Sequence, residues 1–195
     1  VENSIIVVSD GKIITIGPKA TTPLTKQAMD IIDANGKHIY PGFIVSNGTL
    51  GLVEVDAVKA SSDLEEMGTF NPHIRSIIAY NAESKIIESM RPNGVLLGQV
   101  VPRGGRITGT SSVVQYDAWN WEDAAIKIDD GIHLNWPISF KQGRWWTGED
   151  PGYKPNKEYA DQTEAVVTFM ANALAYGKST PKEVNPAFAA MHGIF

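Results

Sequence analysis

The sequence predicts an α/β protein in which a β-rich beginning precedes segments that alternate between helix and buried strand. Up to residue 45, short apolar runs are separated by turn residues, which is typical of a small β-sandwich. From residue 70 the apolar residues take helical spacing, and a continuous apolar run and a Gly-rich loop come next. Helix, buried strand and loop in that order are typical of a parallel sheet or barrel.

The β-rich part is expected to begin with a hairpin. Ser4–Val8 and Lys12–Ile16 are rich in apolar residues and flank an Asp10-Gly11 step, which is a strong turn signal between two strands. Further along, the sequence predicts a strand near Met29–Ile32, a turn at Asn35-Gly36 and a strand at Phe43–Val45.

The second part is expected to place a helix before a buried strand. Asn71-Pro72 can start a helix that runs to about Met90, because isoleucines follow at helical spacing. The Asn93-Gly94 step can end it. Val95–Val101 is a continuous apolar run, which predicts a strand buried on both faces.

Residues 102–155 are expected to form a long loop, because glycines and hydroxyl residues follow the buried strand and all five tryptophans fall between Trp119 and Trp146. The tryptophans admit two interpretations. They give the loop a small core of its own, which we favour, or they line a cleft for a sugar or peptide. A long helix is then predicted over Lys157–Tyr176, and short helical pieces are expected to open at Thr180-Pro181 and Asn185-Pro186.

Composition excludes several function classes. The chain has 17 basic and 22 acidic residues, a net charge of −5 and no block of like charge, which argues against binding to nucleic acid or to a membrane surface. Without cysteine it has no disulfide, thiolate zinc site or cysteine nucleophile. No apolar stretch approaches the roughly 20 residues of a membrane-spanning helix. No signal peptide is visible, but the chain begins with Val1, so cytoplasm and periplasm both stay open.

The loop PRGGRITGTSS is a candidate anion-binding site. It follows the buried strand, and active sites of parallel α/β folds lie at the carboxyl ends of strands. Its glycines allow close backbone approach, Arg103 and Arg106 supply bidentate donors for an anionic group, and Ser111 and Ser112 add hydroxyls. The glycine spacing matches no nucleotide-binding fingerprint. The alternative is an ordinary turn whose arginines pair with nearby carboxylates.

His133 is a second candidate. It lies in DDGIHLNWP, beside Asp129 and Asp130 and within the Trp-rich segment. The alternative is a histidine that only forms hydrogen bonds within a loop. The chain has no G-x-S-x-G motif and no Ser-His-Asp order in its sequence, so a serine-hydrolase mechanism is not expected.

Two segments resemble the amidohydrolase superfamily. SDGKIITIGP is similar to the hairpin of these enzymes, and DANGKHIYPGFI to the segment that links their β-sandwich to a (β/α)8 barrel. From RPNGVLLGQVVP to DDGIHLNWP the chain resembles a bacterial, imidazolonepropionase-like branch. The resemblance implies a piece of β-sandwich over residues 1–42 and the first βα units of the barrel over residues 43–195, with the long loop at about 102–155.

The sequence departs from the superfamily at the metal site. Its members bind a divalent metal with a His-x-His pair, and the metal activates water for attack on a C–N bond. Here the two histidine positions fall on Asn47 and Thr49, and a preceding aspartate position falls on Val45. An amide and a hydroxyl are weak ligands, so no metal or cofactor is expected in this chain. A divalent metal in the complete protein would take most of its ligands from beyond residue 195.

We therefore expect the complete protein to hydrolyse an amide or another C–N bond of a small molecule. The candidate substrate-binding residues are Asn47, Thr49, Arg103, Arg106, Ser111 and His133. The alternative is a catalytically inactive, metal-free binding or scaffolding protein on the same fold. A barrel needs about 250 residues, so the chain is expected to be an incomplete barrel. It would be ordered only with the rest of its own polypeptide or with an oligomer partner.

Overall fold

The structure is a computed structural model that describes residues 2–24, 30–180 and 183–194. It divides into two compact units, Val1–Pro41 and Gly42–Phe195. Within the described ranges, no helix has both the length and the apolar character needed to cross a membrane.

The first unit contains the predicted hairpin. Strands β1 (Ser4–Ser9) and β2 (Lys12–Pro18) pair antiparallel around the Asp10-Gly11 step, whose φ angles are 49° and 71°. Positive φ at both turn positions matches the right-handed twist of the strands, so this prediction is confirmed. The Asn35-Gly36 turn is confirmed in the same way. Met29 lies outside the described residues, and residues 30–32 form no strand, so the strand expected near Met29–Ile32 is not found where the structure describes it.

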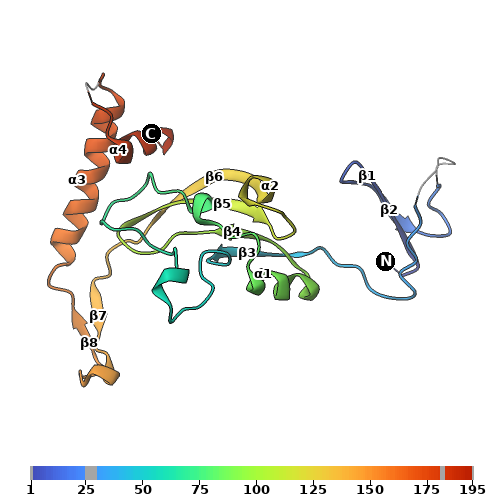
Figure 1. Cartoon of the computed structure of the whole chain (residues 1–195), viewed down its shortest axis with the longest axis horizontal. Helices are drawn as coiled ribbons and strands as arrows, with labels where there is room; N and C mark the ends of the chain where they lie inside the picture. Colours follow the sequence, from blue (N-terminus) through green and yellow to red (C-terminus); the bar gives the residue numbers. More distant parts are fainter. Residues whose placement is uncertain (1, 25–29, 181–182, 195) are drawn as a thin grey trace. The chain divides into compact units, whose positions relative to one another are not determined.

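The second unit is built on a four-stranded sheet of mixed direction (Figure 1). Its strands are β3 (Phe43–Gly48), β4 (Val95–Val100), β5 (Ile107–Gln115) and β6 (Ala125–Leu134), in that spatial order. The pair β3–β4 is parallel, whereas β4–β5 and β5–β6 are antiparallel. The parallel pair agrees with the predicted α/β fold, whereas the two antiparallel pairs were not predicted. The described residues form no closed barrel.

The prediction of a long loop over residues 102–155 is wrong. This segment contains β5, the short helix α2 (Trp121–Ala124), β6, and a small hairpin of β7 (Phe140–Gln142) and β8 (Tyr153–Pro155). The sequence of β5, ITGTSSVVQ, is rich in β-branched residues that favour strands. The buried hydroxyls of Thr110 and Ser111 donate to the carbonyl of Pro72 and to the carboxylate of Asp130, so these polar residues can lie at the centre of the sheet, whereas Oγ1 of Thr108 has no partner among the described residues.

The prediction of a helix from Asn71 to about Met90 is also wrong. The backbone N–H of Asn71 donates to the carbonyl of Ile107 at 2.8 Å, and that of Thr110 donates to the carbonyl of Ile74 at 2.7 Å. These bonds hold the segment extended beside β5, so its backbone groups are used outside a helix. Helical structure is limited to a 3₁₀ turn at Ser76–Ala79 and to α1 (Lys85–Met90). Further 3₁₀ turns lie at Lys59–Ser61, Arg91–Asn93, Trp145–Thr147 and His192–Ile194.

One face of the four-stranded sheet carries the main apolar core. Val100 contributes its side chain from β4, Val114 from β5, and Tyr116 from the position directly after β5. Residues of the connection between β3 and β4 cover them, and the buried members of this group are Leu52, Ile77, Tyr80 and Ile87. Because side chains alternate along a strand, the intervening residues of β4 and β5 point to the opposite face.

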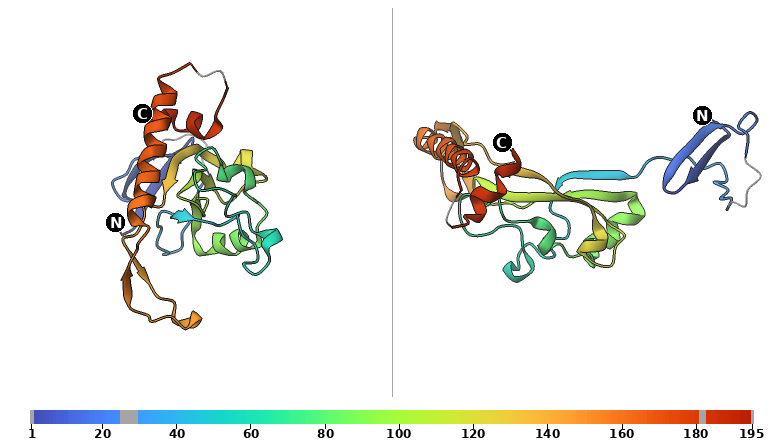
Figure 2. Two further views of the ribbon diagram at one scale, coloured as in Figure 1. Left: turned by 90° about the vertical axis from the view of Figure 1, so that its left-hand side faces the viewer. Right: turned by 90° about the horizontal axis from the view of Figure 1, so that it is seen from above.

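A second core joins the sheet to the C-terminal helices α3 (Tyr159–Gly177) and α4 (Pro186–Ala190), which Figure 2 shows from two sides. Ile107, Ala173 and Met191 are buried in it, and the rings of Phe70 and Phe169 stack with their centroids 4.6 Å apart. The predicted helix at Lys157–Tyr176 is confirmed within two residues. The helical piece opening at Asn185 is confirmed as well, whereas Pro181 lies outside the described residues.

Candidate functional site

Polar side chains from all four strands of the sheet meet around the carboxyl ends of β3 and β4. Since these two strands are parallel, their carboxyl ends lie at the same edge of the sheet. Each residue of the group is joined to another member by a hydrogen bond. We name this group the polar cluster; it consists of Asn47, Gln99, Arg103, Ser111, Asp130 and His133.

Arg103 brings a fixed positive charge to the cluster. Its Nη1 donates to Oδ1 of Asn47 and its Nη2 to the backbone carbonyl of Asn47, each at 2.6 Å. Asn47 has φ 53°, a left-handed conformation that asparagine tolerates better than most residues. The guanidinium has five N–H donors, so donors remain that can bind an anionic group.

Gln99 links the two sides of the cluster. Its Oε1 accepts from the backbone N–H of Asn47 at 3.1 Å, and its Nε2 donates to Oδ2 of Asp130 at 2.8 Å. The same nitrogen lies 3.4 Å from Oγ of Ser111. One side chain on β4 therefore connects β3 with β6 across the face of the sheet.

Ser111 is the centre of the cluster. Its Oγ lies 2.7 Å from Oδ1 of Asp130, 2.8 Å from Nε2 of His133 and 3.1 Å from the carbonyl oxygen of Gly131. The residue is 0% exposed. A hydroxyl with this many partners is held in one orientation, and solvent does not reach it.

A bulge in β6 directs Asp130 into the cluster. Between two regular pairs of β5 and β6, the single residue Ser112 stands opposite residues 128–130. Asp129, in the middle of the bulge, has φ 54°, and its N–H donates to Oγ of Ser112 at 3.1 Å. Its carboxylate accepts from Nε of Arg75 at 2.9 Å. The bulge re-aims the carboxylate that follows, as bulges near functional sites often do.

The electrostatics of the cluster favour a neutral His133. Partial burial of the imidazole lowers the pKa of His133, the carboxylate of Asp130 acts against this, and the guanidinium of Arg103 adds to it. The pKa of His133 is therefore below its ordinary value, so the ring carries no charge at neutral pH. A neutral imidazole keeps one nitrogen as a hydrogen-bond acceptor.

The structure brings together four of the six residues predicted from the sequence: Asn47, Arg103, Ser111 and His133. Arg106 has no hydrogen bond to the polar cluster among the described residues, and its Nη1 donates to the carbonyl of Asn135 at 3.4 Å. Thr49 follows β3, where its carbonyl accepts from Leu52 N–H at 3.0 Å, and its side chain has no bond to the cluster among the described residues.

Sequence reasoning missed Gln99 and gave Asp130 no role of its own. Gln99 is the single polar side chain in the apolar run VLLGQVV, and an amide within such a run indicates a polar partner beside the strand. Asp130 belongs to a bulge in β6, and hydrophobic periodicity does not predict the position of a bulge.

The tryptophans do not form the small core that we favoured for them. Trp121 packs against the main apolar core. The four others expose half or more of their surface, and they are Trp119, Trp136, Trp145 and Trp146. The tryptophans were expected to hold a long loop in place, but β5 and β6 occupy much of that segment.

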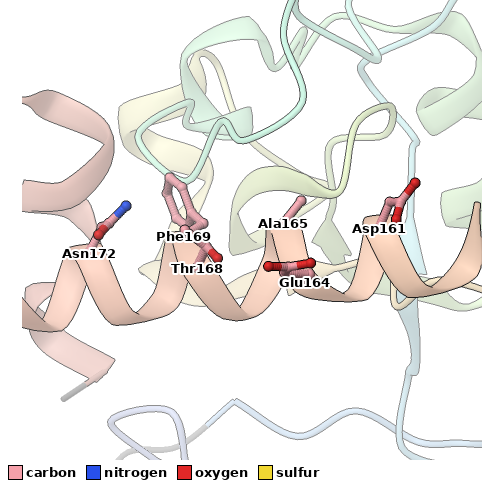
Figure 3. A pocket seen from close by; sticks show the side chains of 6 residues that line it. All are labelled: Asp161, Glu164, Ala165, Thr168, Phe169 and Asn172. Carbon is pink, nitrogen blue, oxygen red and sulfur yellow. The ribbon is translucent and has the colours of Figure 1, made fainter.

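A hollow of about 510 Å³ lies along α3 (Figure 3). Its lining residues all come from that one helix, and they are Asp161, Glu164, Ala165, Thr168, Phe169 and Asn172. A single helix gives it one wall, and no member of the polar cluster takes part. We therefore place the candidate site at the polar cluster.

The polar cluster does not fit a divalent metal ion. It offers one imidazole and one carboxylate, and no group of three or more acidic or histidine side chains suited to a metal occurs among the described residues. Both oxygens of Asn47 accept from Arg103, whose guanidinium would repel a second cation. We therefore assign no chemical step to a metal at this place.

Comparisons with known proteins support the fold. No protein-family model and no curated protein matches the chain. Among solved structures, the chain is similar to the crystal structure of an amidohydrolase from Thermotoga maritima, with 18% sequence identity and a TM-score of 0.66. The similarity covers 95% of this chain and 49% of that one, so the chain spans about half the length of that structure. The chain thus shares the fold of one part of an amidohydrolase.

Proposed function

We propose that the chain is part of an amidohydrolase-like protein whose complete form hydrolyses an amide or another C–N bond of a small molecule. The polar cluster is the observation that carries this proposal, because it lies at the strand ends where α/β folds hold their active sites. The fold shared with part of an amidohydrolase supports it. In this proposal β3 and β4 are strands of a (β/α)8 barrel, and residues 1–42 are a piece of the accompanying β-sandwich.

Arg103 gives the proposed site its preference for an anionic substrate. Asn47 fixes the guanidinium through two hydrogen bonds, which leaves little side-chain entropy to lose when a ligand binds. A carboxylate on the substrate can take the remaining N–H donors in a bidentate geometry. Thr49 and Arg106 stay predicted substrate contacts outside the cluster.

The test uses the complete gene product and a panel of small amides that runs from N-acetylated amino acids to neutral N-alkyl amides. We expect turnover of the carboxylated members, and we expect Arg103→Met to raise KM for them by about 10-fold or more, equivalent to at least about 1.4 kcal/mol. Arg144→Met, on the exposed β7–β8 hairpin, is the matched control and leaves KM unchanged. Equal KM for the two variants would contradict the role of Arg103.

One observation favours the alternative of a catalytically inactive binding or scaffolding protein. Ser111 is buried and every member of the polar cluster has a hydrogen-bond partner, as in a network that only holds a sheet together. The same panel separates the two functions when zinc, iron or manganese is also supplied. Binding of an amide without turnover, with and without added metal, would establish the alternative. The same preparation would show whether the complete protein holds a metal by ligands outside the described residues.

We further propose that the chain is covered by the rest of its own polypeptide or by a partner copy. Phe43 and Ile44, on the edge strand β3, are 67% and 64% exposed, and an apolar strand edge invites pairing. Light scattering after size-exclusion chromatography of residues 1–195 tests this proposal. A stable monomer with one cooperative thermal transition would contradict it.

A further inference from the structure

The hydrogen bonds of Ser111 determine which nitrogen of His133 carries a proton. The hydroxyl has one hydrogen and three possible acceptors around it, which are a carboxylate, a carbonyl and an imidazole nitrogen. The carboxylate of Asp130 is the only charged acceptor and, at 2.7 Å, also the nearest. Oγ therefore donates to Asp130 and accepts from His133, so that Nε2 of His133 carries the hydrogen.

This tautomer leaves Nδ1 of His133 as an open acceptor. No side chain or backbone group among the described residues bonds to it. The side-chain nitrogen and oxygen atoms that are both buried and unpaired in the described ranges are Nδ1 of His73, Oη of Tyr80 and Oγ1 of Thr108. Since Nδ1 of His133 has no partner and is not among them, it is reached by solvent.

We infer that His133 is the general base of the hydrolysis proposed above, with Ser111 and Asp130 as positioning residues. Nδ1 takes a proton from a water molecule while the water oxygen forms a bond to the carbonyl carbon of the substrate. The C–N bond then breaks, and the proton on Nδ1 passes to the leaving nitrogen. The hydrogen bonds from Nε2–H to Ser111 and from Ser111 to Asp130 keep the ring oriented, and they stabilise the imidazolium between the two proton transfers. This inference depends on the proposed function.

Ser111 itself is not the nucleophile. Its Oγ is buried, and its hydrogen bonds to Asp130 and His133 occupy the hydrogen and one lone pair. A substrate carbon cannot approach an oxygen that solvent does not reach. The arrangement differs in this respect from a serine-hydrolase triad, in which the serine is the reacting group and the histidine lies between serine and aspartate.

The charges that surround His133 set the pH at which it can act. Asp130 from β6 and Arg103 from the segment after β4 act on the ring in opposite directions, and Asp129 is paired with Arg75. Because burial prevails, the ring is neutral at pH 7 and able to accept a proton. The rate is expected to rise with pH through the pKa of His133 and then to level off.

The first experiment needs no substrate. A ¹⁵N–¹H correlation of the histidine rings in the complete protein is expected to show His133 neutral, with its hydrogen on Nε2, at pH 7. Ser111→Ala is expected to weaken the preference for this tautomer, whereas His192→Gln, which replaces an exposed histidine outside the cluster, leaves it unchanged. A hydrogen on Nδ1, or a charged ring at pH 7, would overturn the inference.

The second experiment uses the amide panel. His133→Gln is expected to lower kcat by about 10²–10⁴-fold with little change in KM. Ser111→Ala is expected to lower kcat less and to shift the midpoint of the pH profile, which a purely structural serine would not do. If the protein hydrolyses amides and His133→Gln keeps its kcat and pH profile, the inference fails and the proposed function stands. If no amide is hydrolysed, both fail.

Discussion

Replacing Gly98 by alanine tests the packing between the sheet and its apolar core. Gly98 lies on β4, and a Cβ built on it would meet Oη of Tyr116 and would lie 2.5 Å from Cζ of the same ring. Tyr116 is 2% exposed, so its rigid ring has no free space to enter. Burial also raises the pKa of Tyr116 to about 12, in agreement with a phenol held inside the core.

The expected loss follows from this contact. Overpacking of a core by one methyl group costs about 1–3 kcal/mol, and the rigid ring places Gly98→Ala at the upper end. For a domain of about 150–250 residues, 1 kcal/mol corresponds to about 2–4 °C in Tm. We therefore expect the Tm of Gly98→Ala to fall by about 6–12 °C.

The assay is thermal unfolding followed by near-ultraviolet circular dichroism, with Gly193→Ala as the control. A Cβ at Gly193 meets nothing within 4 Å, so this variant should melt like the parent protein. In a Tyr116→Leu background the additional cost of Gly98→Ala should fall below about 1 kcal/mol, because the clashing ring is gone. Equal Tm values for Gly98→Ala and Gly193→Ala would refute the packing described for Tyr116.

Three further changes test other parts of the structure. Thr110→Val removes the hydrogen bond from Oγ1 to the buried carbonyl of Pro72 and should lower the free energy of unfolding in urea by about 1–3 kcal/mol. Thr110→Ser, which keeps the hydroxyl, should lower it less. An unchanged free energy of unfolding in Thr110→Val would show that the 2.7 Å hydrogen bond does not form. Asn185→Ala removes the side chain that accepts from Phe188 N–H at the start of α4 and should cost about 1 kcal/mol in thermal unfolding, and an unchanged Tm would contradict this cap. The lowered pKa of His133 means that the unfolded chain binds a proton more readily, so the free energy of unfolding should fall as the pH drops below about 6.5. His133→Gln should reduce this fall between pH 7 and pH 5, and an identical pH dependence in both proteins would contradict the lowered pKa.

Local signals predicted local structure well. The Asp10-Gly11 turn, the strand at Val95–Val100 and the helix α3 each follow from residues within one short window. The segment after Asn71 shows where such signals fail. Its isoleucines have helical spacing, but its backbone groups form hydrogen bonds with β5, which lies more than 30 positions later in the sequence. A contact between residues so far apart in sequence cannot be detected from the pattern within a segment of helix length.

The sequence predicted most residues of the candidate site, but it did not predict how they are arranged. Arg103 and Ser111 were found because the loop after a buried strand is where an α/β fold holds ligands. Their separation was not predictable: Arg103 precedes β5, Ser111 lies inside it, and a loop was expected for both. The contact between Ser111 and His133 depends on the pairing of β5 with β6 and on the bulge beside Asp130. None of these follows from hydrophobic periodicity.

The parallel pairing of β3 with β4 has a consequence for how the protein is made. The side chain of Gln99 on β4 reaches Asn47 on β3 across 52 positions of sequence. At a synthesis rate of about 5–20 residues per second, β3 waits about 3–10 s on the ribosome before its partner has been made. Until then Phe43 and Ile44 have no β4 to pair with. The nascent chain is thus most vulnerable to aggregation between the synthesis of these two strands, and a chaperone that binds extended apolar segments would act there.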